Sequence, residues 1–165
     1  MKRACIAIVD ALRARIYTYE RTSGDGVGMG SAGALREVTD LVNPGARGHD
    51  QFSTTKPGIK RIASGGGTTD DHRDAHADEL ARRFARQVIS EIDRIVREQA
   101  FDRVLLVASP AMVGELRGVD RALRRPELEV DYIARDLARL TSPQIHDHLA
   151  QLRLVAPRRS AFASG

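Results

Sequence analysis

The stretch RVLLVASPAMVGELR, Arg103–Arg117, joins an apolar run to a helix start. Its unbroken apolar part, Val104–Ala108, is typical of a strand that is buried on both faces of a sheet. Ser109 is predicted to cap the helix that follows, and Pro110 suits the first helical position. Strand ends and helix N-termini often form anion sites in α/β folds, although a plain strand–helix unit explains the stretch more simply.

Composition sets broad limits on the class of protein. A chain of 165 residues, 42% hydrophobic and 29% charged, has the makeup of one soluble globular domain. Its single cysteine, Cys5, rules out an internal disulfide and suits a reducing compartment. The apolar run Ala4–Val9 is too short for the core of a signal peptide, and no run is long enough to span a membrane. We therefore expect a cytoplasmic protein that has no membrane partner.

The charge pattern is mildly basic. The net charge is +4, and arginine favours planar contacts with phosphate or carboxylate. This charge does not by itself separate nucleic-acid binding from a solvated surface. Aromatic residues make up only 4% of the chain, which argues against base-stacking platforms for single strands.

Hydrophobic periodicity predicts a single α/β domain with a five-stranded mixed sheet. Three antiparallel strands come first, and helix-linked strands follow, an order typical of ribonuclease H-like folds. The predicted strands are Ala4–Val9, Ala14–Glu20, Leu35–Val42, Val104–Ala108 and Leu128–Ile133. Three helices are predicted. The first begins at Asp70 or Asp71 and ends near Glu98, the second runs from Pro110 to Arg125, and the third begins at a Thr141–Gln144 capping box.

A long segment without periodicity, residues 43–69, interrupts this pattern. The domain is expected to cover residues 1–155 with this segment as a mobile loop, and residues 156–165 as a flexible tail. The loop contains Arg47, Lys56 and Gly58, a composition that suits a phosphate backbone. A disordered excursion whose charge only keeps it soluble is an equal alternative.

Two sets of residues suggest metal or acid–base chemistry. His72 and His76 have the i, i+4 spacing of metal ligands, but Arg73 stands where a zinc protease needs a glutamate, so a capped helix start is the simpler interpretation. Asp10 follows the first strand, where a two-metal nuclease has a carboxylate, and Asp136 follows the last strand. Ser109 stands where that site would need another acid, so the carboxylate set is incomplete. A turn carboxylate paired with a nearby arginine is the simpler role for Asp10.

Short motifs in a fixed order give the chain a more specific resemblance. It resembles the bacterial host attachment proteins, described as required for attachment to host cells. The matching residues extend to about Leu152 and comprise Asp10-Ala11, Arg13-Ala14-Arg15, Asn43-Pro44, Ala46-Arg47, Lys56-Pro57-Gly58, Phe84-Ala85, Leu105–Pro110, Gly114, Leu116-Arg117 and Asp136-Leu137. That family name describes a phenotype rather than a biochemical activity.

The resemblance implies a fold and a possible role in translation. The family is similar to the middle domain of archaeal and eukaryotic peptide-chain release factors, which has the ribonuclease H-like topology. Those factors act through a Gly-Gly-Gln loop, whereas here Thr68 follows Gly65–Gly67, so that chemistry does not carry over. The family's usual Ser-Asp-Arg-Pro-Gly-Arg is also altered, because Thr54, Thr55, Lys56 and Ile59 replace four of its residues.

Three hypotheses follow. The first is a protein that binds tRNA, the ribosome or other structured RNA and affects attachment indirectly, with anion contacts from Arg13, Arg15, Arg47, Lys56, Gly58 and Arg117. The second is a hydrolase of an RNA-linked ester or phosphodiester that uses Asp10, His72, His76 and Asp136. The third is a protein-interaction module without catalysis. No cofactor is expected, the sequence favours a binding protein over an enzyme, and it leaves the oligomeric state open.

Overall fold

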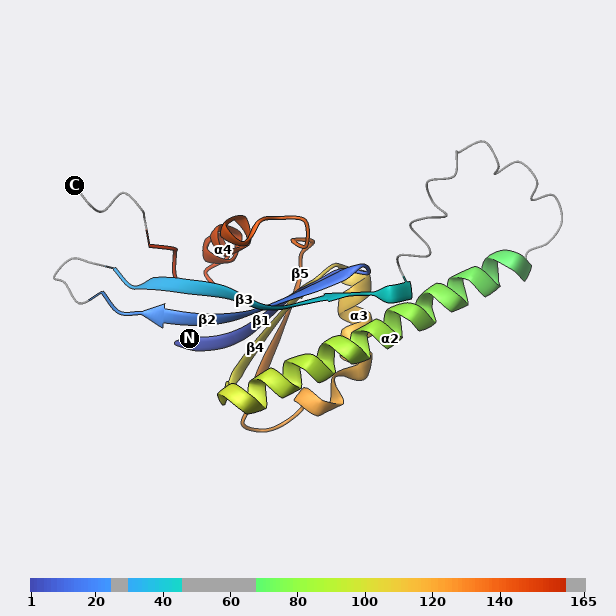
Figure 1. Cartoon of the computed structure of the whole chain (residues 1–165), viewed down its shortest axis with the longest axis horizontal. Helices are drawn as coiled ribbons and strands as arrows, with labels where there is room; N and C mark the ends of the chain where they lie inside the picture. Colours follow the sequence, from blue (N-terminus) through green and yellow to red (C-terminus); the bar gives the residue numbers. More distant parts are fainter. Residues whose placement is uncertain (25–29, 46–67, 160–165) are drawn as a thin grey trace.

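The computed structural model describes residues 1–24, 30–45 and 68–159, with the backbone alone at 68–73. Within these ranges, five strands form one sheet, and α-helices cover both of its faces (Figure 1). The strands are β1 (Arg3–Val9), β2 (Arg13–Thr22), β3 (Ala32–Val42), β4 (Arg103–Ala108) and β5 (Glu129–Ala134). The helices are α2 (Thr68–Gln99), α3 (Pro110–Val119) and α4 (Ser142–Gln151), and a short 3₁₀ helix, η1 (Asp120–Leu123), follows α3.

The sheet confirms the predicted fold class. Its strand order is β3-β2-β1-β4-β5, with β1, β2 and β3 antiparallel and with β4 parallel to both β1 and β5. This mixed order is the ribonuclease H-like topology that the sequence predicts. Because β1 and β4 are central, their side chains are buried on both faces, in agreement with the apolar runs of the sequence.

Each face of the sheet buries its own apolar cluster. On one face, α2 and α3 cover residues such as Ala7, Ile16 and Leu106 (Figure 1). The buried side of α2 includes Phe84, Val88 and Ile92, as its 3.6-residue period predicts. On the other face, α4 covers a second cluster whose members include Ile6, Ile8, Tyr17, Tyr19, Leu105, Val107, Ile145 and Leu149.

A β-bulge changes the register of the edge strand β3. Ile16 pairs with Thr39 and Tyr17 pairs with Glu37, so Val38 has no partner on β2 and is 41% exposed. The extra residue turns Glu37 toward Tyr17 and the α4 side of the sheet. The bulge therefore decides which acidic residues of β3 meet the arginines of β2.

Two details of the predicted helices are wrong at α3. The helix ends at Val119 rather than continuing to Arg125, because the chain tightens into η1 and buries Asp120 and Leu123. The hydroxyl of Ser109 makes no capping hydrogen bond, although Pro110 does stand at the helix start. The capping box of α4 is confirmed, because Thr141 and Gln144 exchange side-chain to backbone hydrogen bonds.

The segment after α4 packs against the domain. The backbone N–H of Ala156 donates to the Tyr19 hydroxyl, and Gly33 N–H donates to the Pro157 carbonyl, at 2.8 Å each. Residues 156–158 thus contact the sheet and α4, where the sequence predicts a flexible tail. Residues 160–165, like the core of the predicted loop, lie outside the described residues. Across the described ranges, the helices are too short or too polar to cross a membrane.

Candidate functional site

Asp10 shapes the turn between β1 and β2. Its Oδ1 accepts hydrogen bonds from the backbone N–H groups of Leu12 (2.8 Å) and Arg13 (2.7 Å). The carboxylate is therefore used to close the hairpin. The arginine pairing predicted for it is absent from the described contacts, where its partners are backbone amides.

The other predicted carboxylate, Asp136, follows the carboxyl end of β5, as Asp10 follows the carboxyl end of β1. It is exposed and stands two residues beyond β5, whereas Asp10 follows β1 directly. Strand β4 lies between β1 and β5, so the two chain paths are roughly 10 Å apart. The described residues contain no group of three His, Cys, Asp or Glu side chains that could hold a metal ion. The structure does not bring a nuclease-like carboxylate set together here.

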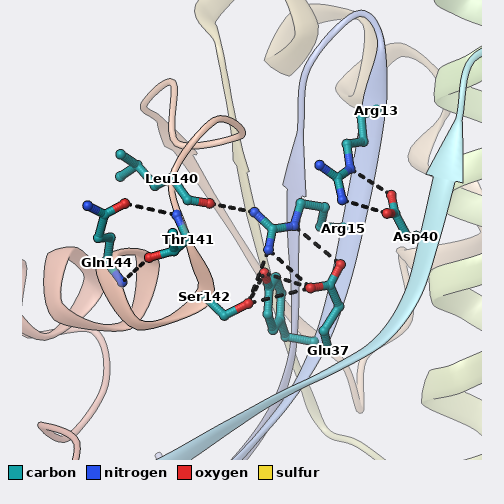
Figure 2. Close-up of polar contacts among 9 residues, drawn as sticks. Arg13, Arg15, Glu37, Asp40, Leu140, Thr141, Ser142 and Gln144 are labelled. Atoms are coloured by element: carbon teal, nitrogen blue, oxygen red, sulfur yellow. Dashed lines mark hydrogen bonds and ion pairs between the residues drawn. The ribbon is translucent and has the colours of Figure 1, made fainter.

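Arg13 and Arg15, two predicted anion-binding residues, pair with acids of β3 (Figure 2). Arg13 donates to both oxygens of Asp40, at 2.8 and 2.6 Å, in an exposed pair. The hydrogen bond from Arg13 lowers the pKa of Asp40, so the pair stays ionised at neutral pH. The positive charge of Arg13 is therefore already compensated within the protein.

Arg15 is buried in a polar network that connects β2, β3 and α4. Its guanidinium donates to both oxygens of Glu37 (3.2 and 3.1 Å), to the Leu140 carbonyl (2.6 Å) and to Ser142 Oγ (3.1 Å). The Tyr17 hydroxyl donates to Glu37 and lies 3.0 Å from Ser142 Oγ. Figure 2 shows these side chains converging from the two strands and the helix start. Because all three nitrogens of this guanidinium donate and its side chain is only 9% exposed, the network fixes α4 to the sheet and leaves little of Arg15 for a ligand.

The predicted histidine pair and loop residues do not add to a described site. His76 is exposed on α2, and His72 lies in the part of α2 that is described by its backbone only. Arg47, Lys56 and Gly58 lie outside the described residues. An open hollow of about 730 Å³ lies where β1, β4 and β5 begin, beside Lys2, Arg103 and Glu129. None of the predicted site residues lines it.

Arg117 is the predicted residue whose surroundings suit a ligand best. It is exposed near the end of α3, and its guanidinium carbon lies 4.8 Å from the centre of the Tyr132 ring on β5. This cation–π contact holds the side chain in place while leaving the N–H donors of the guanidinium free to bind an anion. The described contacts include no acidic partner for Arg117.

Two more arginines share the surface of Arg117. Arg121 lies in η1 and Arg124 follows it; both are exposed, and Arg124 donates to the backbone carbonyl of Arg117 at 3.1 Å. The acid among them, Asp120, is 7% exposed and accepts hydrogen bonds from Tyr132 Oη (2.5 Å) and Arg124 Nε (2.6 Å). We call Arg117, Arg121 and Arg124, with Tyr132 and Asp120, the arginine face. Arg117 and Arg121 have no acidic partner among the described contacts, whereas Arg124 is paired with the buried carboxylate of Asp120.

The arginine face was only partly predictable. Sequence reasoning identified Arg117 but missed Arg121, Arg124, Asp120 and Tyr132. The i, i+4, i+7 spacing of the arginines was the available signal. Burial raises the pKa of Tyr132 and its hydrogen bond to Asp120 raises it further, so the tyrosine remains a protonated donor at neutral pH.

The fold and this surface define a small α/β protein with a ribonuclease H-like sheet and a basic surface beside the edge strand β5. The chain belongs to the family described as "Protein required for attachment to host cells", whose model matches residues 5–149. No curated protein matches the chain. Among solved structures, the type II variant of the Ppx/GppA phosphatase from Aquifex aeolicus is similar over 81% of this chain and 36% of that chain, with 14% identity and a TM-score of 0.35. The chain therefore spans about a third of the length of that phosphatase.

Proposed function

We propose that this host attachment family protein is a cytoplasmic RNA-binding protein that engages tRNA, the ribosome or another structured RNA. The observation that supports it is the arginine face, where Arg117, Arg121 and Arg124 point outward around a buried acid. Guanidinium groups bind phosphate through planar, charge-assisted hydrogen bonds, and three exposed arginines close together along the chain suit a run of backbone phosphates better than a single anion.

The residues that we assign to RNA contact differ from those that the sequence alone predicts. Arg13 and Arg15 are left out, because each donates to both oxygens of an acid, Asp40 or Glu37, whereas Arg124 donates to Asp120 through Nε alone. Arg47, Lys56 and Gly58 remain predicted contacts of the segment outside the described residues. Arg117 becomes the central contact, because its stack on Tyr132 lowers the entropy that is lost when the side chain binds.

The resemblance to release-factor middle domains suggests where such binding acts. A translation-related partner would connect the family's attachment phenotype to protein synthesis, with attachment affected indirectly. The chain lacks the Gly-Gly-Gln sequence, so the proposed role is binding without peptide release. The hydrolase alternative has no comparable support, since Oδ1 of Asp10 closes a hairpin turn and the described residues hold no group of three His, Cys, Asp or Glu side chains around it.

The test is a binding assay with a salt series. Filter binding to tRNA and co-sedimentation with ribosomes are measured for the wild type and for the double variant Arg117→Ala/Arg121→Ala. Loss of two phosphate contacts is expected to reduce the slope of log K against log salt by about 1.5. The matched control is Arg36→Ala, an exposed arginine on β3 at the opposite edge of the sheet, which is expected to leave that slope nearly unchanged.

Two results would contradict this proposal. Absence of binding to both tRNA and ribosomes at low salt would remove RNA as the partner and favour the protein-interaction module. An effect of the double variant no larger than about twice that of the Arg36→Ala control, which removes one charge instead of two, would show that net charge rather than the arginine face governs binding.

A further inference from the structure

A buried carboxylate lies directly beneath the arginine face. Asp120 begins η1, and its side chain is 9% exposed, so it is withdrawn from any ligand on that surface. A count of charges alone would treat this acid as unfavourable for RNA binding, because it reduces the net charge of a basic surface. Its hydrogen bonds indicate a different role.

The two oxygens of Asp120 hold two parts of the arginine face. Oδ2 accepts the Tyr132 hydroxyl at 2.5 Å, and the ring of Tyr132 lies against the Arg117 guanidinium. Oδ1 accepts Arg124 Nε at 2.6 Å, and Arg124 in turn donates to the backbone carbonyl of Arg117 at 3.1 Å. Both routes from Asp120 therefore end at Arg117, one through its side chain and one through its backbone.

We propose that Asp120 is a positioning residue that orients Arg117 and Arg124 for phosphate contact; this inference rests on the proposed RNA-binding function. An arginine side chain that moves freely loses rotamer freedom when it binds, whereas one already fixed loses less. The bonds to Asp120 and to the Arg117 carbonyl engage Nε and Nη2 of Arg124, which leaves Nη1 of this largely exposed side chain without a partner among the described contacts. The carboxylate also offsets part of the repulsion between guanidinium groups on the same surface.

A pair of charge-matched variants separates positioning from net charge. Asp120→Asn and Glu127→Gln each remove one negative charge. Glu127 is a suitable control because its side chain is 72% exposed and its ion pair is with Arg125, outside the arginine face. With tRNA as the probe, we expect Asp120→Asn to weaken binding about 3- to 10-fold and to lower the salt slope, despite its added positive charge. Glu127→Gln is expected to bind as tightly as the wild type or more tightly.

A second variant keeps the test decisive if Asp120→Asn does not fold, which circular dichroism and thermal melting report. Tyr132→Phe retains the ring beneath Arg117 and removes only the hydroxyl that donates to Asp120. Weaker tRNA binding by Tyr132→Phe supports the positioning role, and unchanged binding overturns it.

Failure of this inference is distinguishable from failure of the proposed function. If Asp120→Asn binds tRNA as tightly as Glu127→Gln while Arg117→Ala/Arg121→Ala binds weakly, positioning is refuted and RNA binding stands. If wild-type protein binds no RNA at low salt, the proposed function itself fails, and the positioning role fails with it.

Discussion

Replacing Arg15 with alanine is expected to destabilise the protein far more than the same change at Arg13. Both arginines lie on β2, and each forms a two-pronged ion pair with an acid of β3. They differ in their surroundings, because Arg15 is 7% exposed and also donates to the Leu140 carbonyl and Ser142, whereas the side chain of Arg13 is 43% exposed. The two variants remove the same side chain from the same kind of ion pair, so they show how burial changes the contribution of that pair to stability.

The expected magnitude follows from what each variant leaves behind. Breaking a buried ion pair by removing one partner costs about 3–5 kcal/mol. Because the Glu37 side chain is 29% exposed and water screens it in part, we expect the free energy of unfolding to fall by roughly 2–3 kcal/mol for Arg15→Ala. For the exposed pair of Arg13 and Asp40, we expect a loss of about 0.5 kcal/mol. In a domain of this size, these losses correspond to melting-temperature decreases of about 5–10 °C and about 2 °C.

Urea unfolding and thermal melting of the two variants provide the measurement. The double variant Arg15→Ala/Glu37→Ala completes a mutant cycle, with an expected coupling energy of about 1–2 kcal/mol. Similar losses for Arg13→Ala and Arg15→Ala, within about 0.5 kcal/mol, would refute the reasoning that burial separates the two pairs. Folded Arg15→Ala is also expected to keep its affinity for tRNA, since this guanidinium is buried and paired with Glu37.

Three further results are expected. Burial alone would raise the pKa of Asp93, but hydrogen bonds from two arginines outweigh this effect and hold the pKa below its ordinary value. The stability that Asp93→Asn removes is therefore present above about pH 4 and disappears as the pH falls through the lowered pKa of the folded state. Urea unfolding of both proteins at pH 7 and pH 3 measures this difference. Gly114→Ala, in an open part of α3, is expected to stabilise by about 0.5–1 kcal/mol, whereas Gly33→Ala is expected to cost about 1–3 kcal/mol because its Cβ would lie 2.5 Å from the Tyr19 ring; thermal melting checks both signs. Burial raises the pKa of the Cys5 thiol to about 12, so Ellman's reagent at pH 8 is expected to label unfolded but not native protein.

The strand and helix pattern was largely predictable from the sequence. The apolar run Val104–Ala108 appears as the buried strand β4, and the predicted strand Leu35–Val42 falls within β3. These features depend on periodicity, which is local. The end of α3 was not predictable in this way, because the 3₁₀ helix that follows it buries Asp120 in a hydrogen bond with Tyr132, and that contact exists only once β5 is in place.

The candidate site was harder to predict because it depends on register. Which acid Arg15 meets is decided by the bulge at Val38, which turns Glu37 toward the α4 side of the sheet. Nothing in the local sequence around Arg15 distinguishes a free arginine from a paired one. Conversely, Arg117 gains its ring contact from Tyr132 through the pairing of β5 with β4.

The central position of β1 has a consequence for how the chain acquires its structure during synthesis. Strands β1, β2 and β3 join through short connections along the chain, so this meander can form as soon as it leaves the ribosome. The other edge of β1 must wait for β4, since Cys5 pairs with Val104. At ordinary elongation rates this delay is about 5–20 s, during which an apolar strand edge stays open. We therefore expect nascent chains that end before β4 to be the forms most prone to aggregate and most dependent on chaperones.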